Sequence, residues 1–314
     1  MHRPLRLTID SAAFADNWRW LRDRAGVAAG AAIKADAYGL GAREAMSSLY
    51  QAGCRDFFVS VWSEAAELGP VPEGAAVAVL HGIGPDDVDV ALGSQARPVL
   101  NSAEQVGRWK QPAPGRPCDV MVDTGMNRLG LRPDEIAALD GLAIDTLHSH
   151  LACADEDHAL NAKQLQRFRD VASVVPARRY SLANSAGICL GRDYSFDLVR
   201  PGLALYGGIP RREAEGAIRQ VAHVEAQVVQ RRIIRTGESC GYGATFVADA
   251  DVETAILNIG YADGYLRGFS SKGAAFAGEF ALPVFGRVSM DLIAVGCDAA
   301  PDLREGEWVE IDYD

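Results

Sequence analysis

Residues 31–41 read Ala31-Ala32-Ile33-Lys34-Ala35-Asp36-Ala37-Tyr38-Gly39-Leu40-Gly41, an apolar run that carries a single lysine and then breaks into a turn. Gly39 and Gly41 allow the backbone to turn sharply or to approach a ligand closely. A lysine at the end of a buried strand is poorly placed for a solvated charge, and in apolar surroundings it loses its proton readily and becomes a nucleophile. Two interpretations of Lys34 therefore stand: an ordinary surface lysine at a strand end, and an amine that forms a Schiff base.

The composition is that of a globular protein with a net negative charge. At 314 residues the chain is long enough for about two domains, and its 48% hydrophobic and 23% charged residues are close to globular averages. A net charge of -11 argues against binding of nucleic acid or of an anionic membrane through a basic surface. No segment approaches the roughly eighteen apolar residues of a membrane span, and no signal-like apolar region follows the start. We therefore expect a cytoplasmic protein that binds neither nucleic acid nor membrane.

The six cysteines are scattered without the C-x-x-C spacing that is typical of zinc sites. The sequence therefore predicts neither a metal site nor a disulfide framework.

Apolar runs typical of buried strands alternate with helical segments downstream of residue 31. Helical spacing of apolar residues predicts helices over 42–51, 85–92, 102–109, 133–139 and 158–175. A strand at 5–9 and a helix that Asp10-Ser11 would cap precede the alternation. Eight strands alternating with helices over some 200 residues predict a (β/α)8 TIM barrel, an α/β fold, over 10–215. The eight runs are 31–35, 57–61, 76–80, 98–100, 119–122, 144–148, 179–182 and 196–199.

The rhythm changes after residue 215. Apolar and polar residues alternate from Ala222 to Val228, as they do in a half-buried antiparallel strand. Further strand-like runs at 253–259, 281–285, 292–295 and 307–311 are separated by glycine-rich turns. A mostly β C-terminal domain is therefore predicted over 216–314, together with residues 1–9.

Unusual polar residues follow the predicted barrel strands, at the end of the barrel where active sites lie. Lys34 ends the first strand, Arg128 follows the fifth and His150 the sixth. Taken alone, His150 could be a satisfied core histidine, and Asn184-Ser185 a mere helix cap. A serine at a helix start after the seventh strand and Gly202 after the eighth also suit a phosphate. A reactive lysine with a phosphate cradle predicts pyridoxal phosphate as the cofactor.

Eight motifs, in order along residues 33 to 291, resemble bacterial alanine racemase. That resemblance implies a barrel plus a β domain, working as a head-to-tail homodimer whose two active sites each draw residues from both subunits. It implies reversible interconversion of L-alanine and D-alanine, which supplies D-alanine for cell-wall peptidoglycan. The motifs are Ile33-Lys34-Ala35-Asp36-Ala37-Tyr38-Gly39, Asp123-Thr124-Gly125-Met126-Asn127-Arg128-Leu129-Gly130, His148-Ser149-His150, Ala183-Asn184-Ser185-Ala186, Val199-Arg200-Pro201-Gly202, Gly241-Tyr242-Gly243-Ala244-Thr245-Phe246, Gly260-Tyr261-Ala262-Asp263-Gly264-Tyr265 and Gly286-Arg287-Val288-Ser289-Met290-Asp291.

The resemblance also assigns roles to single residues. Lys34 would hold the cofactor as an internal aldimine and exchange the α-proton on the face that leads to the D-isomer. Tyr242 of the partner subunit would be the opposite base, and inversion of a planar carbanion needs bases on both faces. Other implied roles are cofactor contacts at Tyr38, His150, Ser185, Arg200, Gly202 and Leu203, substrate contacts at Arg128, Tyr261 and Met290, and a substrate entrance lined by Asp155, Arg267 and Arg287.

Two features depart from the family pattern. Many relatives carry a carbamylated lysine two residues before the Asp-Thr-Gly, where it orients the arginine, but this chain has Met121 there. Arg128 would then be positioned by a bound anion or by neighbouring backbone. The chain ends at Ile311-Asp312-Tyr313-Asp314, which we expect to be a truncation that removes another active-site tyrosine.

The residues leave other functions open. A broad-specificity amino-acid racemase would share the motifs, because they do not fix the size of the pocket. A non-catalytic pyridoxal-phosphate-binding protein would resemble the barrel alone and would not need Tyr242. A fold-related decarboxylase of basic amino acids would not need the pair of Lys34 and Tyr242.

Overall fold

Residues 3–313 are described by the computed structural model, and they fall into two units. One unit is Asp10–Val221, and the other joins the first strand to the chain from Ala222 onward. The division follows Val221, whereas the sequence placed it after residue 215. The chain between these points belongs to the first unit because Ile218 and Val221 are buried in its core.

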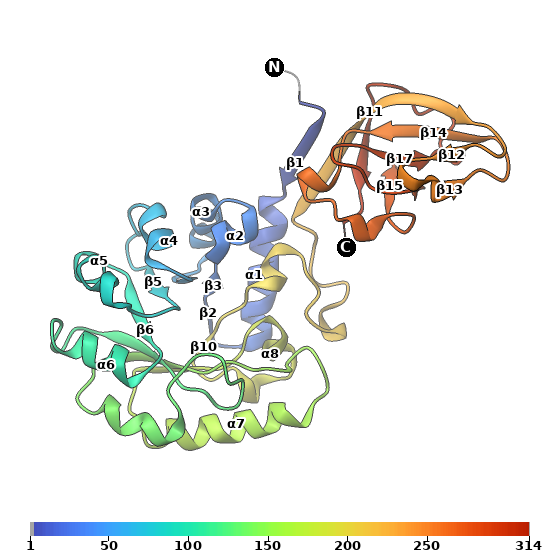
Figure 1. Cartoon of the computed structure of the whole chain (residues 1–314). Helices are drawn as coiled ribbons and strands as arrows, with labels where there is room; N and C mark the ends of the chain where they lie inside the picture. Colours follow the sequence, from blue (N-terminus) through green and yellow to red (C-terminus); the bar gives the residue numbers. More distant parts are fainter. Residues whose placement is uncertain (1–2, 314) are drawn as a thin grey trace. The chain divides into compact units, whose positions relative to one another are not determined.

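The first unit is a closed ring of parallel strands (Figure 1). Seven strands pair in sequence order. Hydrogen bonds from Asp197 N to Tyr180 O (3.1 Å) and from Arg200 N to Ala183 O (2.9 Å) connect the seventh strand to β10 (Leu198–Val199). β10 pairs with β2 (Ala28–Ala29), which closes the ring and confirms the predicted barrel. The seven strands are β3 (Ala31–Ala32), β4 (Asp56–Val59), β5 (Ala76–Val79), β6 (Arg97–Leu100), β7 (Cys118–Met121), β8 (Ile144–His148) and β9 (Arg179–Ser181).

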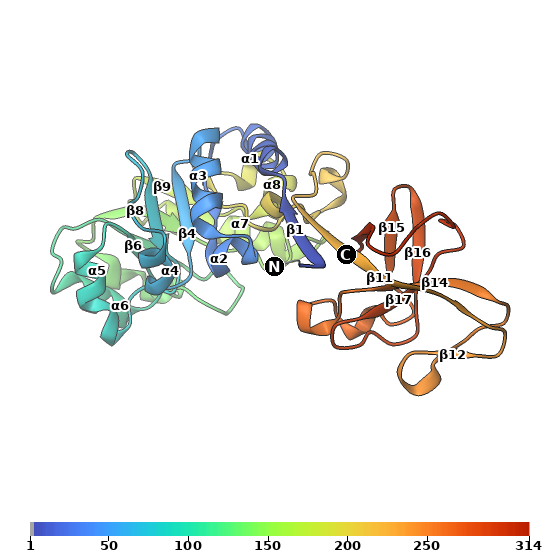
Figure 2. The ribbon, with the colours of Figure 1, turned by 90° about the horizontal axis from the view of Figure 1, so that it is seen from above.

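Helices lie outside the ring and connect successive strands (Figures 1 and 2). The Asp10 carboxylate caps the first by accepting from Ala13 N at 2.8 Å, as the sequence predicts. The segment Pro133–Leu139 is a 3₁₀ helix (η2), and Pro85–Asp87 is another (η1), which precedes α5. The α-helices outside the ring are α1 (Ser11–Ala25), α3 (Ala42–Ala52), α4 (Trp62–Glu67), α5 (Val88–Gly93), α6 (Ala103–Lys110), α7 (Ala159–Ala172) and α8 (Ser185–Cys189); 3₁₀ turns η3 (Arg192–Tyr194), η4 (Leu203–Tyr206) and η5 (Arg212–Ala214) follow α8.

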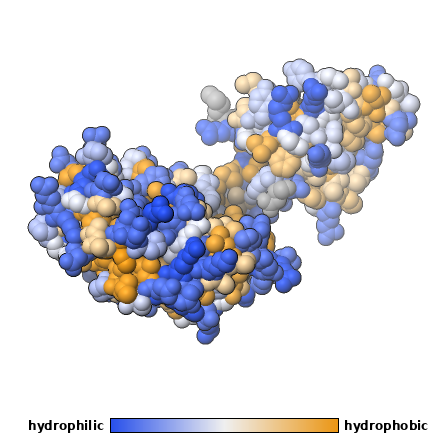
Figure 3. Space-filling view, turned by 60° about the horizontal axis from the view of Figure 1, so that its bottom comes forward, coloured by the Kyte–Doolittle hydropathy of each residue, from blue (hydrophilic) through white to orange (hydrophobic). Residues whose placement is uncertain are grey.

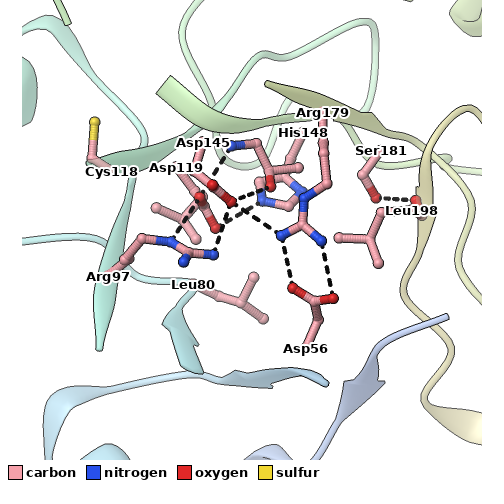
Figure 4. A network of polar contacts seen from close by, with 12 residues as sticks. Asp56, Leu80, Arg97, Cys118, Asp119, Asp145, His148, Arg179, Ser181 and Leu198 are labelled. Carbon is pink, nitrogen blue, oxygen red and sulfur yellow. Dashed lines mark hydrogen bonds and ion pairs between the residues drawn. The ribbon is translucent and has the colours of Figure 1, made fainter. Parts of the chain in front are cut away.

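Charged side chains form a largely buried network where the barrel strands begin (Figure 4). Asp145 lies 2.6 Å from Arg178, 3.0 Å from Arg179 and 3.1 Å from Arg97. Arg179 also donates to both oxygens of Asp56, at 2.7 and 3.0 Å. These side chains are 10–20% exposed except Arg178. The hydrophobic pattern of the strands did not predict this network, because pairing between charged side chains on different strands depends on the folded barrel.

The network continues to two fully buried groups. The carboxylate of Asp119 on β7 is 1% exposed and lies 3.3 Å from both Arg97 Nε and His148 Nε2. His148 on β8 is completely buried. Burial, together with the charge of Arg200 and against the opposing effect of Asp119, lowers the pKa of His148 to about 4. The imidazole is therefore neutral in the folded protein.

The second unit is a mostly β domain, as predicted. β11 (Ala222–Ile234) pairs with β14, with β1 and with β18, so that antiparallel strands close on themselves in the order β11, β14, β17, β16, β15, β18, while β12 and β13 pair separately. Their inner face buries residues such as Ala226, Leu257 and Val295. The other strands are β1 (Leu5–Ile9), β12 (Ser239–Cys240), β13 (Phe246–Val247), β14 (Val252–Leu257), β15 (Ala274–Ala277), β16 (Phe280–Phe285), β17 (Ile293–Gly296) and β18 (Trp308–Ile311), of which β12, β13 and β15 were not predicted.

The surface is mixed in character. On the face shown in Figure 3, hydrophobic residues gather in separate patches among mainly hydrophilic ones. Within residues 3–313, no helix combines the length and the apolar composition that crossing a membrane requires.

Candidate active site

A pocket of about 560 Å³ lies where the barrel strands end. Its size is in the range of cofactor and small-molecule sites. The strands bring side chains that are far apart in the sequence to this one place, as the rule for barrels predicts. Nine of the residues singled out in the sequence line it: Lys34, Tyr38, Arg128, His150, Asp155, Ser185, Arg200, Gly202 and Leu203.

Lys34 opens the segment labelled α2 (Lys34–Gly39), whose backbone is an unusual left-handed turn. Four consecutive residues without glycine, 35–38, have φ between 51° and 59°. Each such residue costs about 1–2 kcal/mol, because its Cβ crowds the following carbonyl. The sequence predicted a turn through Gly39 and Gly41, but nothing in residues 35–38 signals this conformation. Strain of this kind persists only where surrounding contacts enforce it, as they do at functional sites.

Tyr38 fills the space where residue 202 would carry a side chain. Its ring stacks on Tyr206 at 4.3 Å between centroids, and the Tyr206 hydroxyl donates to Ala32 O at 2.8 Å. A Cβ added to Gly202 would lie 2.5 Å from the Tyr38 hydroxyl oxygen. Gly202 is therefore required by the approach of Tyr38, and Tyr206 is a supporting residue that the sequence did not reveal.

Ser185 ties the loops after β9 and β10 together. It begins α8, where Asn184 accepts from Gly187 N at 2.8 Å as the helix cap. The buried Ser185 Oγ accepts from Gly202 N at 3.0 Å and from Ala204 N at 3.2 Å. The serine, the glycine and the start of the next 3₁₀ turn are thus held in one small cradle of hydroxyl and backbone groups.

Arg200 is a buried cation whose hydrogen-bond partners are neutral. Its Nη2 donates to Ser149 O at 2.5 Å, and its Nη1 donates to Ser181 Oγ. Ser181 in turn donates to Leu198 O at 2.5 Å. Burial lowers the pKa of Arg200 to about 10, so that the guanidinium remains charged. Ser149 and Ser181 were not identified as site residues in the sequence, because each acts through contacts across the barrel.

His150 is neutral and is surrounded by cations. Burial and the charges of Arg200, Arg128 and Lys34 lower its pKa to about 3. An imidazole of this kind can accept or donate a hydrogen bond without adding a fourth positive charge. The field of the pocket is positive and favours an anionic ligand.

Arg128 stands in a loop whose backbone is well held. Asp123 Oδ1 accepts from Gly125 N at 2.8 Å and from Met126 N at 2.9 Å. The side chain of Arg128 is exposed, and within residues 3–313 no hydrogen bond or ion pair holds its guanidinium. Met121, at the position where the resemblance leads one to expect a carbamylated lysine, is buried and lines the same pocket.

The other five residues predicted for the site lie in loops of the second unit. Tyr242 begins η6 (Tyr242–Ala244) and is 69% exposed, and a Cβ on Gly243 would be 3.3 Å from the Arg287 guanidinium carbon. Tyr261 begins η7 (Tyr261–Asp263), and its N–H donates to Ser289 O at 3.0 Å, next to Met290. The guanidinium of Arg267, in η8 (Arg267–Phe269), lies 5.6 Å from the Tyr261 ring centroid. The structure thus groups Tyr242 with Arg287, and Tyr261 with Met290 and Arg267.

The pocket fits pyridoxal phosphate. It offers a primary amine at Lys34, two further cations for a phosphate or a carboxylate, and the cradle that Ser185 forms with the backbone of Gly202 and Ala204. In the part of the chain that the structure describes, there is no group of three or more His, Cys, Asp or Glu side chains that could hold a metal ion.

Comparisons with known proteins cover nearly the whole chain. Family models described as alanine racemase, N-terminal domain, and alanine racemase, C-terminal domain, match residues 9–210 and 221–312. The alanine racemase of Dinoroseobacter shibae is 44% identical over 95% of this chain and 86% of that protein. That of Rhizobium meliloti is 40% identical over 98% of this chain and 87% of that protein. The crystal structure of alanine racemase from Bartonella henselae with covalently bound pyridoxal phosphate is 38% identical and matches with a TM-score of 0.92, covering 99% of this chain and 91% of that one.

Proposed function

The chain belongs to the alanine racemase family, and on that premise we propose that it interconverts L-alanine and D-alanine with two bases, Lys34 and Tyr242, on opposite faces of the substrate. Pyridoxal phosphate, when bound, supplies the electron sink that makes the α-proton of the amino acid acidic. The observation that carries the proposal is the pocket itself, in which the amine of Lys34 faces a set of cations and the Gly202 cradle.

Lys34 has two tasks in this scheme. Its Nζ would hold the cofactor between turnovers, and it would then take or return the α-proton on the face that leads to D-alanine. Tyr38, Ser185, Gly202 and Leu203 would hold the phosphate, and His150 would support the ring as a neutral hydrogen-bond partner. The hydrogen bonds from Gly202 and Ala204 to Ser185 keep the phosphate end of the pocket in shape.

Arg200 would face the ring nitrogen of the cofactor. A guanidinium donates a hydrogen bond and keeps its proton, so it cannot protonate that nitrogen. Its buried position and neutral partners hold the charge in place. Without a proton on its ring nitrogen, the cofactor would be a weaker electron sink. This suits the removal and return of one proton and disfavours side reactions such as transamination.

We propose that the enzyme is a homodimer with shared sites. Tyr242, Leu266 and Met290, in loops of the second unit, are 69%, 65% and 58% exposed, and large exposed side chains of this kind favour cover by a partner. Tyr242 of one subunit would serve as the second base of the other. Arg128 would bind the substrate carboxylate with Met290 and Tyr261, and the substrate entrance would be lined by Asp155, Arg267 and Arg287.

We place the enzyme in the cytoplasm and assign its product to peptidoglycan synthesis. The net charge of -11 and the family support a protein that acts on a small metabolite and does not bind nucleic acid.

The test incubates purified, cofactor-loaded protein with each alanine enantiomer in deuterated water. We expect both enantiomers to acquire α-deuterium and the optical rotation to decay to zero from either side. Bound cofactor without exchange from either enantiomer would refute the racemase and favour a non-catalytic binding protein. Comparable rates with larger amino acids such as leucine would show a broad-specificity racemase.

A further inference from the structure

We infer that Glu64 is a positioning residue, which holds the strained turn that carries Lys34. Glu64 lies in α4, after β4, and is half-buried. Its Oε1 accepts from Ala35 N at 2.8 Å, and its Oε2 accepts from Ser60 N at 2.6 Å. One carboxylate thus joins the loop after β3 to the loop after β4, next to the lysine.

The hydrogen bond from Ala35 N to Glu64 lies at the start of the strained turn. Ala35 directly follows Lys34 and is the first of the four residues with positive φ. At the far end of the turn, Asp36 accepts from Ala42 N at 2.7 Å through its side chain and from Gly41 N at 2.9 Å through its carbonyl. Within the described residues, Glu64 is the side chain that fixes the turn at the Lys34 end. A strained segment relaxes when its restraints are removed, so loss of Glu64 would free Lys34 from its position.

The two carboxylate oxygens have different tasks. Glu64 is the third residue of α4, and Oε2 reaches back to the backbone before the helix, as in a helix cap. Val61, at the N-cap position, offers no side-chain cap. Oε1 contributes nothing to its own helix and serves the neighbouring turn. If Glu64 served only to cap α4, the hydrogen bond to Oε2 alone would be sufficient.

Comparing Glu64→Gln with a control variant separates the loss of the two hydrogen bonds from the loss of a negative charge on α4. The amide retains one acceptor oxygen, and its NH₂ group would face one of the two backbone donors. Glu67→Gln is the matched control, because it removes the same charge from the same helix. No hydrogen bond or ion pair of the Glu67 carboxylate is present within residues 3–313, and the side chain is exposed.

The inference rests on Lys34 as the residue that holds the cofactor, and it is tested by hydrogen exchange, by cofactor capture and by steady-state kinetics. Hydrogen exchange of the cofactor-free protein, read by mass spectrometry, reports on residues 35–38 without catalysis. The rate at which added pyridoxal phosphate becomes bound to Lys34 is read from the visible absorbance. In Glu64→Gln we expect faster exchange in the turn, roughly tenfold slower capture and a kcat lowered by about ten- to a hundredfold with little change in KM, because small misplacements of a reacting group have effects of this size.

Glu67→Gln should match the unmodified protein in all three respects. Equal exchange and capture in Glu64→Gln and the unmodified protein would overturn the inference, as would equal impairment of Glu67→Gln. If Glu64→Gln does not fold, Glu64→Asp replaces it, since its shorter side chain keeps the charge but cannot span both amides. Failure of the unmodified protein to racemise alanine would refute the proposed function, and the exchange of the turn would still test Glu64.

Discussion

Replacing Gly202 by alanine should set the new methyl group against the Tyr38 hydroxyl. The added Cβ would lie 2.5 Å from that oxygen, closer than real Cβ contacts allow, and 3.4 Å from Tyr38 Cζ and from Ala32 Cβ. Tyr38 cannot move aside without cost, because its ring stacks on Tyr206 at 4.3 Å. The clash is therefore confined to a single oxygen atom, which Tyr38→Phe removes.

The magnitude follows from overpacking. Extra methyl groups in packed sites cost about 1–3 kcal/mol, and displaced aromatic stacking accounts for about 0.5–1.5 kcal/mol of this. In the phenylalanine background the nearest remaining atoms lie at 3.4 Å, which is ordinary van der Waals contact. Any backbone cost of alanine at φ -133° and ψ -81° is the same in both backgrounds and cancels in a double-mutant cycle. We expect a coupling free energy of about 1–2 kcal/mol.

The assay is urea unfolding of four cofactor-free proteins: unmodified, Gly202→Ala, Tyr38→Phe and the double variant. Gly202→Ala should lower the free energy of unfolding markedly in the presence of the hydroxyl and only slightly in its absence. Titration with pyridoxal phosphate should show weaker binding by Gly202→Ala. A coupling below about 0.5 kcal/mol, the usual limit of additivity, would refute the close approach of Tyr38 and Gly202.

Two further predictions concern pH and the buried charges. Burial lowers the pKa of His148 to about 4 and that of His150 to about 3, so their contribution to stability is complete above the ordinary value of 6.5 and is lost as the pH falls towards these values. NMR should show both imidazoles neutral at about pH 5, while the free energy of unfolding decreases from about pH 7 to about pH 5; two protonated rings in the folded protein would contradict this. Asp145→Asn should lower the free energy of unfolding by about 3–5 kcal/mol, because it leaves largely buried cations short of a carboxylate; a loss under about 1 kcal/mol, typical of surface ion pairs, would show that the network contributes little. The largely buried arginines are Arg97 and Arg179, and the exposed Arg178 also loses its ion pair.

The barrel could be predicted because its strands are short apolar runs between helical segments. What the sequence could not show arises from contacts between distant residues. The first strand is divided between β2 and β3 at Gly30, where a Cβ would lie 2.7 Å from Asp56 O, so the neighbouring strand leaves no room for a side chain there. Likewise, the positive φ angles of residues 35–38 depend on surroundings such as Glu64 and not on local propensity.

The residues that line the pocket could also be predicted from the sequence. Strand order and motif place Lys34, His150 and Arg200 at one end of the barrel regardless of their partners. Their supports, such as Ser149 and Tyr206, carry no motif of their own and act through a carbonyl or a ring that only the folded chain brings near. The short strand β15 escaped prediction because Ala274–Ala277 has little of the β-branched character of strands.

The two-base scheme is tested most directly by the direction of proton exchange in Tyr242→Phe. The cofactor-loaded variant is incubated in deuterated water with D-alanine or with L-alanine, and Tyr50→Phe, which removes a hydroxyl that contacts Glu73 O, is the control. We predict that α-deuteration of D-alanine at Lys34 persists, while turnover from L-alanine falls by about 10²–10⁴-fold, the usual contribution of a general base. Equal retention of both reactions would remove Tyr242 from the mechanism and contradict the account.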